Sequence, residues 1–254
     1  ISLPSTGDEE WQATRESFNS GWLTQGPKVA EFEKQFAKRH SVQQALATTS
    51  CTTGLHLILA ALDIGPGDEV IVPAFTWVAT ANVVLYCGAT PVFADVDRTT
   101  NNIDPQDVAK RVTPRTKAVI AVHLFGLCAD MDSLKDVLPK HVHIIEDAAC
   151  AAGAMYKSGY AGALGTAAAF SFHPRKSITT GEGGMITTDD AELAGKMNKL
   201  RNHGASISEE QRHNGPRPYL LPEFNLLGFN YRMTDLQGAV GLVQLSKLDN
   251  FIAE

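Results

Sequence analysis

Short apolar runs that close on polar or small residues alternate with helical segments along most of this chain. Residues 69–73, 116–122 and 142–147 are such runs, and stretches with helical spacing of apolar residues lie between them. Strands that alternate with helices form a mostly parallel sheet flanked by helices. In such α/β folds the chemistry gathers where the strands end. The sequence therefore predicts an α/β protein with its functional groups at one edge of a sheet.

The stretch from Ser171 to Gly184 contains the most informative of these strand ends. The apolar run 167–172 predicts a buried strand, Pro174 marks a turn, and Lys176 precedes a glycine-rich segment. Lys176 is thus expected at the mouth of the sheet, where a lysine can form a Schiff base with a carbonyl compound. An ordinary surface lysine is the alternative, and the glycines and an upstream carboxylate favour the functional reading.

A second strand end carries a hydroxyl-rich turn. The strand-like residues 44–48 lead into Ser50, Cys51, Thr52 and Thr53, and an apolar helix is expected over 55–62. Free backbone N–H groups, a helix dipole and several hydroxyls make such a junction a site for an anion. A plain helix cap is the alternative. The GxxxxGK[ST] pattern of a Walker loop is absent from the sequence.

Two further strand ends supply a flat ring and an acid. Trp77 follows the strand 69–73 at the same edge of the sheet, where it either belongs to the core or stacks on a planar ligand. The strand 142–147 closes on Asp147, and the small residues that follow let a ligand approach closely. An anion site, an aromatic face, a carboxylate and a lysine are together what pyridoxal 5′-phosphate (PLP) needs.

Composition and charge argue against several other classes of protein. The 254 residues carry a formal net charge of −6, which gives no reason to expect nucleic acid or an anionic membrane as partner. The four cysteines form no CxxC pair and no zinc spacing, so we expect no metal and a reduced, cytoplasmic setting. The N-terminus lacks a secretion signal, and the longest apolar stretch, 118–129, is too short to span a bilayer.

Several stretches, spread over nearly the whole chain, are similar to motifs of one enzyme family. The sequence resembles the nucleotide-sugar aminotransferases of the DegT/StrS type, which are fold-type I PLP enzymes. The resemblance implies that 1–232 is a PLP-binding large domain with an N-terminal arm. It also implies that 233–254 is a helix leading toward a C-terminal small domain that this chain lacks. The motifs are Gly21–Pro27, Gly65–Pro73, Ile145–Ala149, Ser171–Pro174 with Lys176, Gly181–Gly184 and Asn230–Met233.

The resemblance also implies roles for single residues. Lys176 would bond the cofactor aldehyde and move protons, and Asp147 would pair with the pyridine nitrogen. Trp77 would stack on the ring. The phosphate would be held by Thr52, Thr53 and Ser171, and by Asn230 reaching toward a neighbouring subunit.

Each of these assignments has a structural alternative. Thr53 can serve only as a helix cap, Ser171 can satisfy backbone groups, and Asn230 can be a turn residue. His173 and Gly26 are expected to contact substrate, although His173 is as well explained as a core histidine. His123 and His56 are interpreted as structural. Both Cys51 and Cys150 depart from the family pattern close to the expected cofactor, Cys150 where the family often has His, Gln or Glu.

The implied reaction is transfer of an amino group from an amino acid, expected to be glutamate, to a keto-sugar nucleotide. The residues of the His-Pro and Gly-Glu-Gly-Gly motifs resemble family members that aminate C4 of the sugar more than those that aminate C3. We expect a homodimer with shared active sites, acting in lipopolysaccharide or other cell-surface polysaccharide and amino-sugar biosynthesis. The alternatives are a PLP-binding sugar dehydratase, a non-catalytic PLP-binding or sensory protein of the same fold, and an α/β scaffold that acts through partners. The dehydratase branch has histidine in place of the lysine, so Lys176 argues against it.

Overall fold

A seven-stranded, mostly parallel sheet organises the computed structural model, which describes residues 3–207 and 212–254. Strand β9 alone among these seven runs opposite to the rest, because it pairs antiparallel with both of its neighbours. The carboxyl ends of the other six strands and the amino end of β9 therefore share one edge. The strand order is β1 (Gln44–Thr48), β9 (Gly184–Thr188), β8 (Ala167–Ser171), β5 (His143–Asp147), β4 (Thr116–Val122), β2 (Glu69–Pro73) and β3 (Thr90–Ala94).

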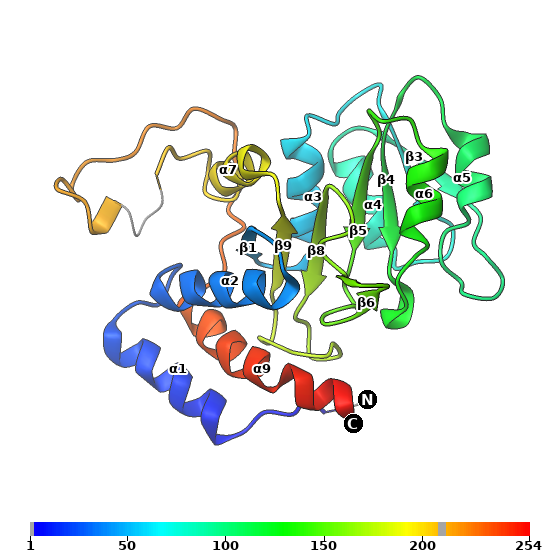
Figure 1. Ribbon diagram of the computed structural model, residues 1–254. Helices are drawn as coiled ribbons and strands as arrows, with labels where there is room; N and C mark the ends of the chain where they lie inside the picture. The colour runs from blue at the N-terminus through cyan, green and yellow to red at the C-terminus, as the bar shows by residue number, and fades with distance from the viewer. Residues whose placement is uncertain (1–2, 208–211) are drawn as a thin grey trace.

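Helices cover both faces of this sheet (Figure 1). One face is covered by α3 (Cys51–Ala61), α4 (Ala79–Tyr86) and α7 (Ala191–Leu200). The other face carries α2 (Pro27–His40) and α9 (Asp235–Ala253) over one half, and α5 (Pro105–Arg111) and α6 (Met131–Val137) over the other. The remaining elements are α1 (Asp8–Ser20), which lies against α9, a short 3₁₀ turn η1 (Leu124–Gly126), and the hairpin β6 (Met155–Tyr156) with β7 (Gly159–Tyr160).

The alternation of side chains along each strand divides the core between these faces. In β8, Ala167 and Ala169 pack under α3 and α7, whereas Ala168 and Phe170 pack toward α2 and α9. Every second residue of a strand points to the same face, so a strand buried on both sides is apolar throughout. This explains why the sequence shows continuous apolar runs, and it confirms the predicted α/β class with a mostly parallel sheet.

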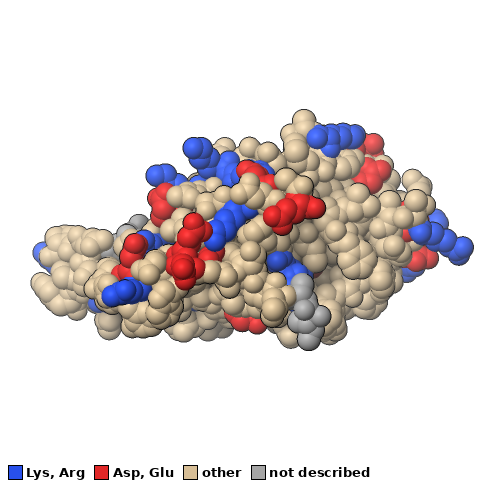
Figure 2. Space-filling model, turned by 90° about the horizontal axis from the view of Figure 1, so that it is seen from below, with Lys and Arg blue, Asp and Glu red and all other residues tan. Residues whose placement is uncertain are grey.

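One buried carboxylate joins α9 to α2. Asp235, in the first turn of α9, accepts hydrogen bonds from the backbone N–H groups of Gly26, Lys28 and Val29 at 2.9, 3.1 and 2.9 Å. It thereby satisfies donors that the first turn of α2 leaves free. Figure 2 shows the molecule from below, with acidic and basic side chains intermixed rather than gathered into a field of one sign.

The structure shifts some of the expected boundaries. The apolar helix expected over 55–62 begins at Cys51, so Thr52 and Thr53 belong to its first turn. The helix expected from Met233 begins at Asp235, because Thr234 and Gln237 form a capping box there. Among the described residues, no helix is long and apolar enough to cross a membrane.

Gly184 is expected to be essential to this packing. A Cβ atom at Gly184 would lie 2.4 Å from the carbonyl carbon of Ser50 and 2.6 Å from the nitrogen of Cys51, both backbone atoms that cannot move aside. We expect Gly184→Ala to lower the free energy of unfolding by about 2 kcal/mol or more in urea titrations. Gly195→Ala is the matched control, because a Cβ there meets nothing within 4 Å and lies inside α7. The control should gain about 0.5–1 kcal/mol, and equal effects of the two changes would contradict this account.

His40, at the end of α2, should make the stability of the fold depend on pH. Burial lowers the pKa of His40 from 6.5 to about 4, and the ring is fully buried. Between these values the unfolded chain binds more protons than the folded one, so stability falls as the pH falls. The neutral, buried ring contributes about 3 kcal/mol to the free energy of unfolding. This contribution is fully present above pH 6.5 and is lost by about pH 4. Unfolding free energies measured from pH 7 to 4 should therefore fall less steeply for His40→Gln, and parallel curves would contradict the assignment.

Candidate active site

Asp147 ends β5 on the face covered by α3 and α4. Its Oδ2 accepts a hydrogen bond from the Thr80 hydroxyl at 2.8 Å, and its Oδ1 accepts one from the N–H of Ala149 at 3.2 Å. The side chain of Thr80, in turn, lies 2.9 Å from the hydroxyl of Thr76. Asp147 is buried, with 5% of its surface exposed. A carboxylate held from two sides in this way presents a fixed acceptor to whatever occupies the sheet edge.

Lys176 lies in the loop that joins β8 to β9. A turn holds it there, with its backbone N–H donating to the carbonyl of His173 at 2.9 Å. Its amine donates a hydrogen bond to the Sγ of Cys150 at 3.1 Å. Cys150 is three residues after Asp147, on the loop that leaves β5. The lysine and the carboxylate are thus presented by neighbouring strands.

Cys51, at the start of α3, lies close to the Asp147 carboxylate. Its thiol lies 3.8 Å from Oδ1 of Asp147 and 3.4 Å from the carbonyl of Ala169. Burial raises the pKa of the Cys51 thiol, the Asp147 carboxylate raises it further, and the Lys176 charge opposes the rise. Cys51 therefore lies near both charged groups, and Cys150, the partner of Lys176, is three residues from Asp147. That Lys176 and Asp147 act in one site stays a prediction.

The first turn of α3 forms the floor of this site. The N–H groups of Cys51 and Thr52 begin the helix, and none of the described residues accepts a hydrogen bond from them or from the Thr52 hydroxyl. The Thr53 hydroxyl, by contrast, is used in a capping box with Ser50. Ser171 lies next to this turn, because its partner in the β8–β9 register is Gly184, which contacts Ser50 and Cys51. Free amides, a free hydroxyl and the Ser171 side chain make a fitting cradle for a phosphate.

The other predicted residues lie at the rim or away from it. Trp77 is 72% exposed just before α4, and its backbone carbonyl accepts from the N–H of Thr80, the residue that holds Asp147. Stacking of its ring on a cofactor stays a prediction. Asn230 is exposed and bridges to Asn202, and the next residue, Tyr231, accepts from the N–H of Thr49. The structure contains one subunit, so the contact of Asn230 with a neighbour stays a prediction.

The two residues expected to contact substrate have structural partners here. The Nδ1 of His173 accepts from the N–H of Arg175 at 3.3 Å, within the turn that carries Lys176. Gly26 is buried at the start of α2, where its N–H donates to Asp235. Their proposed contacts with substrate stay predictions.

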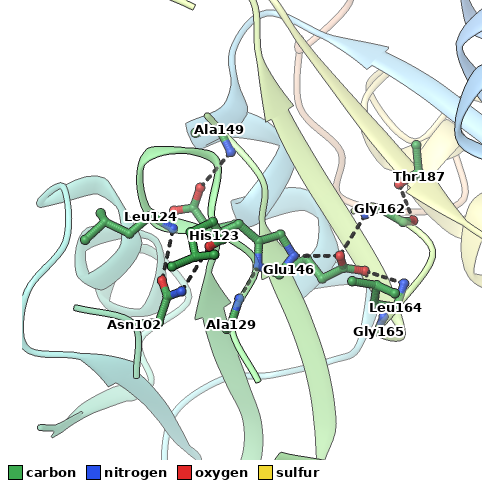
Figure 3. Close-up of polar contacts among 12 residues, drawn as sticks. Asn102, His123, Leu124, Ala129, Glu146, Ala149, Gly162, Leu164, Gly165 and Thr187 are labelled. Carbon is green, nitrogen blue, oxygen red and sulfur yellow. Dashed lines mark hydrogen bonds and ion pairs between the residues drawn. The ribbon is translucent and has the colours of Figure 1, made fainter. Parts of the chain in front are cut away.

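A second carboxylate, Glu146, precedes Asp147 in β5, so the alternation of the strand turns it to the opposite face of the sheet. Figure 3 shows Glu146 among its polar partners. It accepts hydrogen bonds from the N–H groups of Gly162, Leu164 and Gly165 at 2.7–2.8 Å and lies 2.8 Å from Nε2 of His123. The Nδ1 of His123 accepts from the N–H of Ala129, so its Nε2 carries the proton that is donated to Glu146. Burial raises the pKa of Glu146, but the hydrogen bonds outweigh it and the pKa is lowered.

Sequence reasoning missed two of these positioning groups. Thr80 gave no signal, because a threonine inside an apolar helix is common and its contact with Asp147 depends on how α4 crosses the sheet. Glu146 stood beside Asp147, and the strict alternation of a strand could have separated their roles. His123 was interpreted as structural, and its full burial beside Glu146 agrees with that interpretation.

The donor set fits PLP. The cradle at α3 suits a phosphate, Asp147 suits a protonated ring nitrogen, and Lys176 suits an aldehyde. Among the described residues no cluster of three or more His, Cys, Asp or Glu side chains could hold a metal ion.

Solved structures place this fold among the PLP aminotransferases. An aminotransferase from Psychrobacter cryohalolentis superposes with a TM-score of 0.92 at 38% identity, covering 98% of this chain and 64% of that one. Spr1654 from Streptococcus pneumoniae, described as a sugar aminotransferase, matches in its PMP form (TM-score 0.92, 31% identity, 98% and 68% covered). Its PLP form matches with a TM-score of 0.90 at 32% identity, with 98% and 67% covered.

The sequence comparisons identify the family. Residues 4–254 match the DegT/DnrJ/EryC1/StrS aminotransferase family, and the chain belongs to it. It is 48% identical over 250 residues to the spore coat polysaccharide biosynthesis protein SpsC of Bacillus subtilis, covering 98% of this chain and 64% of that protein. It is 46% identical over 255 residues to a GDP-perosamine synthase of Caulobacter vibrioides, covering 100% and 66%. The chain thus spans slightly less than two thirds of the length of these relatives.

Replacing Thr80 by valine should weaken the hold on Asp147 without changing the side-chain shape. We expect the free energy of unfolding to fall by about 1–2 kcal/mol, because the buried carboxylate loses a donor. Thr80→Ser keeps the hydroxyl and is the matched control, with a smaller loss expected. Urea titrations at neutral pH make the measurement, and a valine variant as stable as the wild type would refute the role given to this hydroxyl.

Proposed function

We propose that this chain binds PLP and transfers an amino group from an amino acid to a keto-sugar nucleotide. The observation that carries the proposal is the placement of Lys176 and Asp147 on neighbouring strand ends, both within electrostatic reach of Cys51. Family membership supports the same reaction class. The names of the two relatives, which concern polysaccharide biosynthesis and GDP-perosamine, support a sugar as the amino acceptor.

Asp147 would pair with the ring nitrogen of the cofactor. Thr80 and the N–H of Ala149 each bind one carboxylate oxygen, so the carboxylate cannot rotate away from the ring. A negative charge at this place favours the protonated pyridine, and PLP then supplies an electron sink for a carbanion at the amino-acid α-carbon. Cys51, which is 8% exposed beside Asp147, would help to keep water from this carboxylate.

Lys176 would bond the cofactor aldehyde at rest and work as an acid–base group when released. Its amine, held on a short turn, would take the proton from the α-carbon of the donor and give it to the carbon of the cofactor aldehyde group, and would move a proton in the reverse direction when the sugar is aminated. The phosphate would rest on the N–H groups of Cys51 and Thr52, with the hydroxyls of Thr52 and Ser171 beside it, and Thr53 next to them. Trp77 would lie over the ring, and Asn230 would serve the phosphate of a neighbouring subunit.

Finer features belong to the same proposal. We expect glutamate as the donor, C4 of the sugar as the position aminated, and a cytoplasmic homodimer with shared sites. Lipopolysaccharide or another cell-surface polysaccharide is the expected destination of the product. His173 and Gly26 would contact substrate, and residues 233–254 would lead toward a smaller second domain. A sugar dehydratase is disfavoured by Lys176, and a non-catalytic PLP binder is the alternative that the experiment separates.

The experiment incubates the purified full chain with PLP, removes unbound PLP by gel filtration, and follows the visible absorbance of the protein before and after glutamate. A band that shifts on adding glutamate supports transamination, whereas a band that never shifts supports a binder. Lys176→Ala should lose the band while keeping its circular dichroism, and amino transfer should fall by at least about 10²–10⁴-fold. A screen of keto-sugar nucleotides against the aminated cofactor then identifies the acceptor. Absence of colour in the wild type would overturn the proposal.

A further inference from the structure

The amine of Lys176 has an uncommon partner in this chain. Its recorded hydrogen bond goes to the Sγ of Cys150 at 3.1 Å, and among the described residues no carboxylate lies within 4.0 Å of it. A thiol is a weaker acceptor than a carboxylate or an amide oxygen. The amine is therefore held by a contact that is directional but easily broken.

Backbone contacts fix the position of Cys150. The residue lies in a turn in which the N–H of Ala151 donates to the carbonyl of Ala148 at 2.9 Å. The carbonyl of Cys150 lies against Gly126, where an added Cβ would come within 3.3 Å of it. Ala148 and Ala151 are both buried, so the turn is anchored on each side of Cys150.

The exposed thiol faces the loop of Lys176 rather than the core. Cys51, the other thiol of the site, is buried and turned toward Asp147 and Ala169. The two thiols of the site therefore have different surroundings, one beside the carboxylate and one beside the amine. Of these two thiols, Cys150 is the one that accepts a hydrogen bond from the amine.

We propose that Cys150 is a positioning residue that holds the amine of Lys176 whenever this amine is not bonded to the cofactor. During amino transfer the lysine is released and has to stay near the reacting carbon, and a side chain with four rotatable bonds loses that position readily. A weak hydrogen bond restricts the amine without competing strongly with its next bond. The catalytic role of this contact rests on the proposed function. The contact itself can be tested without cofactor.

The first test labels lysines of the protein without PLP by reductive methylation and reads each site by mass spectrometry. The quantity compared is the rate at Lys176 divided by the rate at Lys140, an exposed lysine. Cys150→Ala should raise this ratio about two- to tenfold, because the amine no longer has to break a hydrogen bond before it reacts. Cys150→Ser, which keeps an acceptor, should raise it less. Cys87→Ala is the matched control and should leave it unchanged, because Cys87 lies at the far end of α4.

The second test uses the protein with PLP, glutamate and an accepted keto-sugar nucleotide. Cys150→Ala should lower kcat about two- to tenfold and leave the KM for glutamate unchanged, with Cys150→Ser recovering part of the loss. Equal labelling ratios in the wild type, Cys150→Ala and Cys150→Ser would overturn the inference even where the wild type transfers amino groups. A wild type without amino transfer that keeps the labelling contrast would overturn the proposed function and leave the holding contact standing. Circular dichroism shows whether a variant unfolds, and labelling ratios are compared only between folded variants.

Discussion

Two consecutive carboxylates at the end of β5 point to opposite faces of the sheet, and the rest of the site depends on this division. Glu146 ties β5 to the segment 162–165 and to His123, whereas Asp147 faces α3 and α4. Each carboxylate is buried, and each accepts hydrogen bonds from several donors, Glu146 from three backbone N–H groups and His123, and Asp147 from Thr80 and Ala149. One of them therefore stabilises the strand end on which the other is presented.

The elements of the fold that end at the site were largely predictable from the sequence. The strand ends at Asp147 and before Lys176 were predictable, because apolar runs that stop at polar residues mark the edge of a parallel sheet. The strand-to-helix turn at Thr52 was predictable for a similar reason, although the helix begins one turn earlier than expected, and the anion site there stays a prediction. The antiparallel direction of β9 has its signal in the segment between Ser171 and Gly184, where no helix is expected, whereas a connection between parallel neighbours usually needs one.

Contacts between distant segments were beyond the reach of the sequence. Thr80 meets Asp147 only because α4 crosses the sheet at one particular place, and Gly184 touches Ser50 only because β9 lies beside β1. The partner of Lys176 was equally hidden, since Cys150 was noted as a departure from the family pattern without a known neighbour. These are the contacts that convert a set of strand ends into one site.

The loop of Lys176 is closed at its own base. The N–H of Phe172 donates to the carbonyl of Gly183, and the N–H of Thr180 donates back to the carbonyl of Phe172, so both ends of the loop are pinned within one hairpin. The position of the amine is consequently encoded by a single short, contiguous segment. Substitutions in the surrounding rim can therefore change the walls around this loop while the Lys176 amine stays where it is.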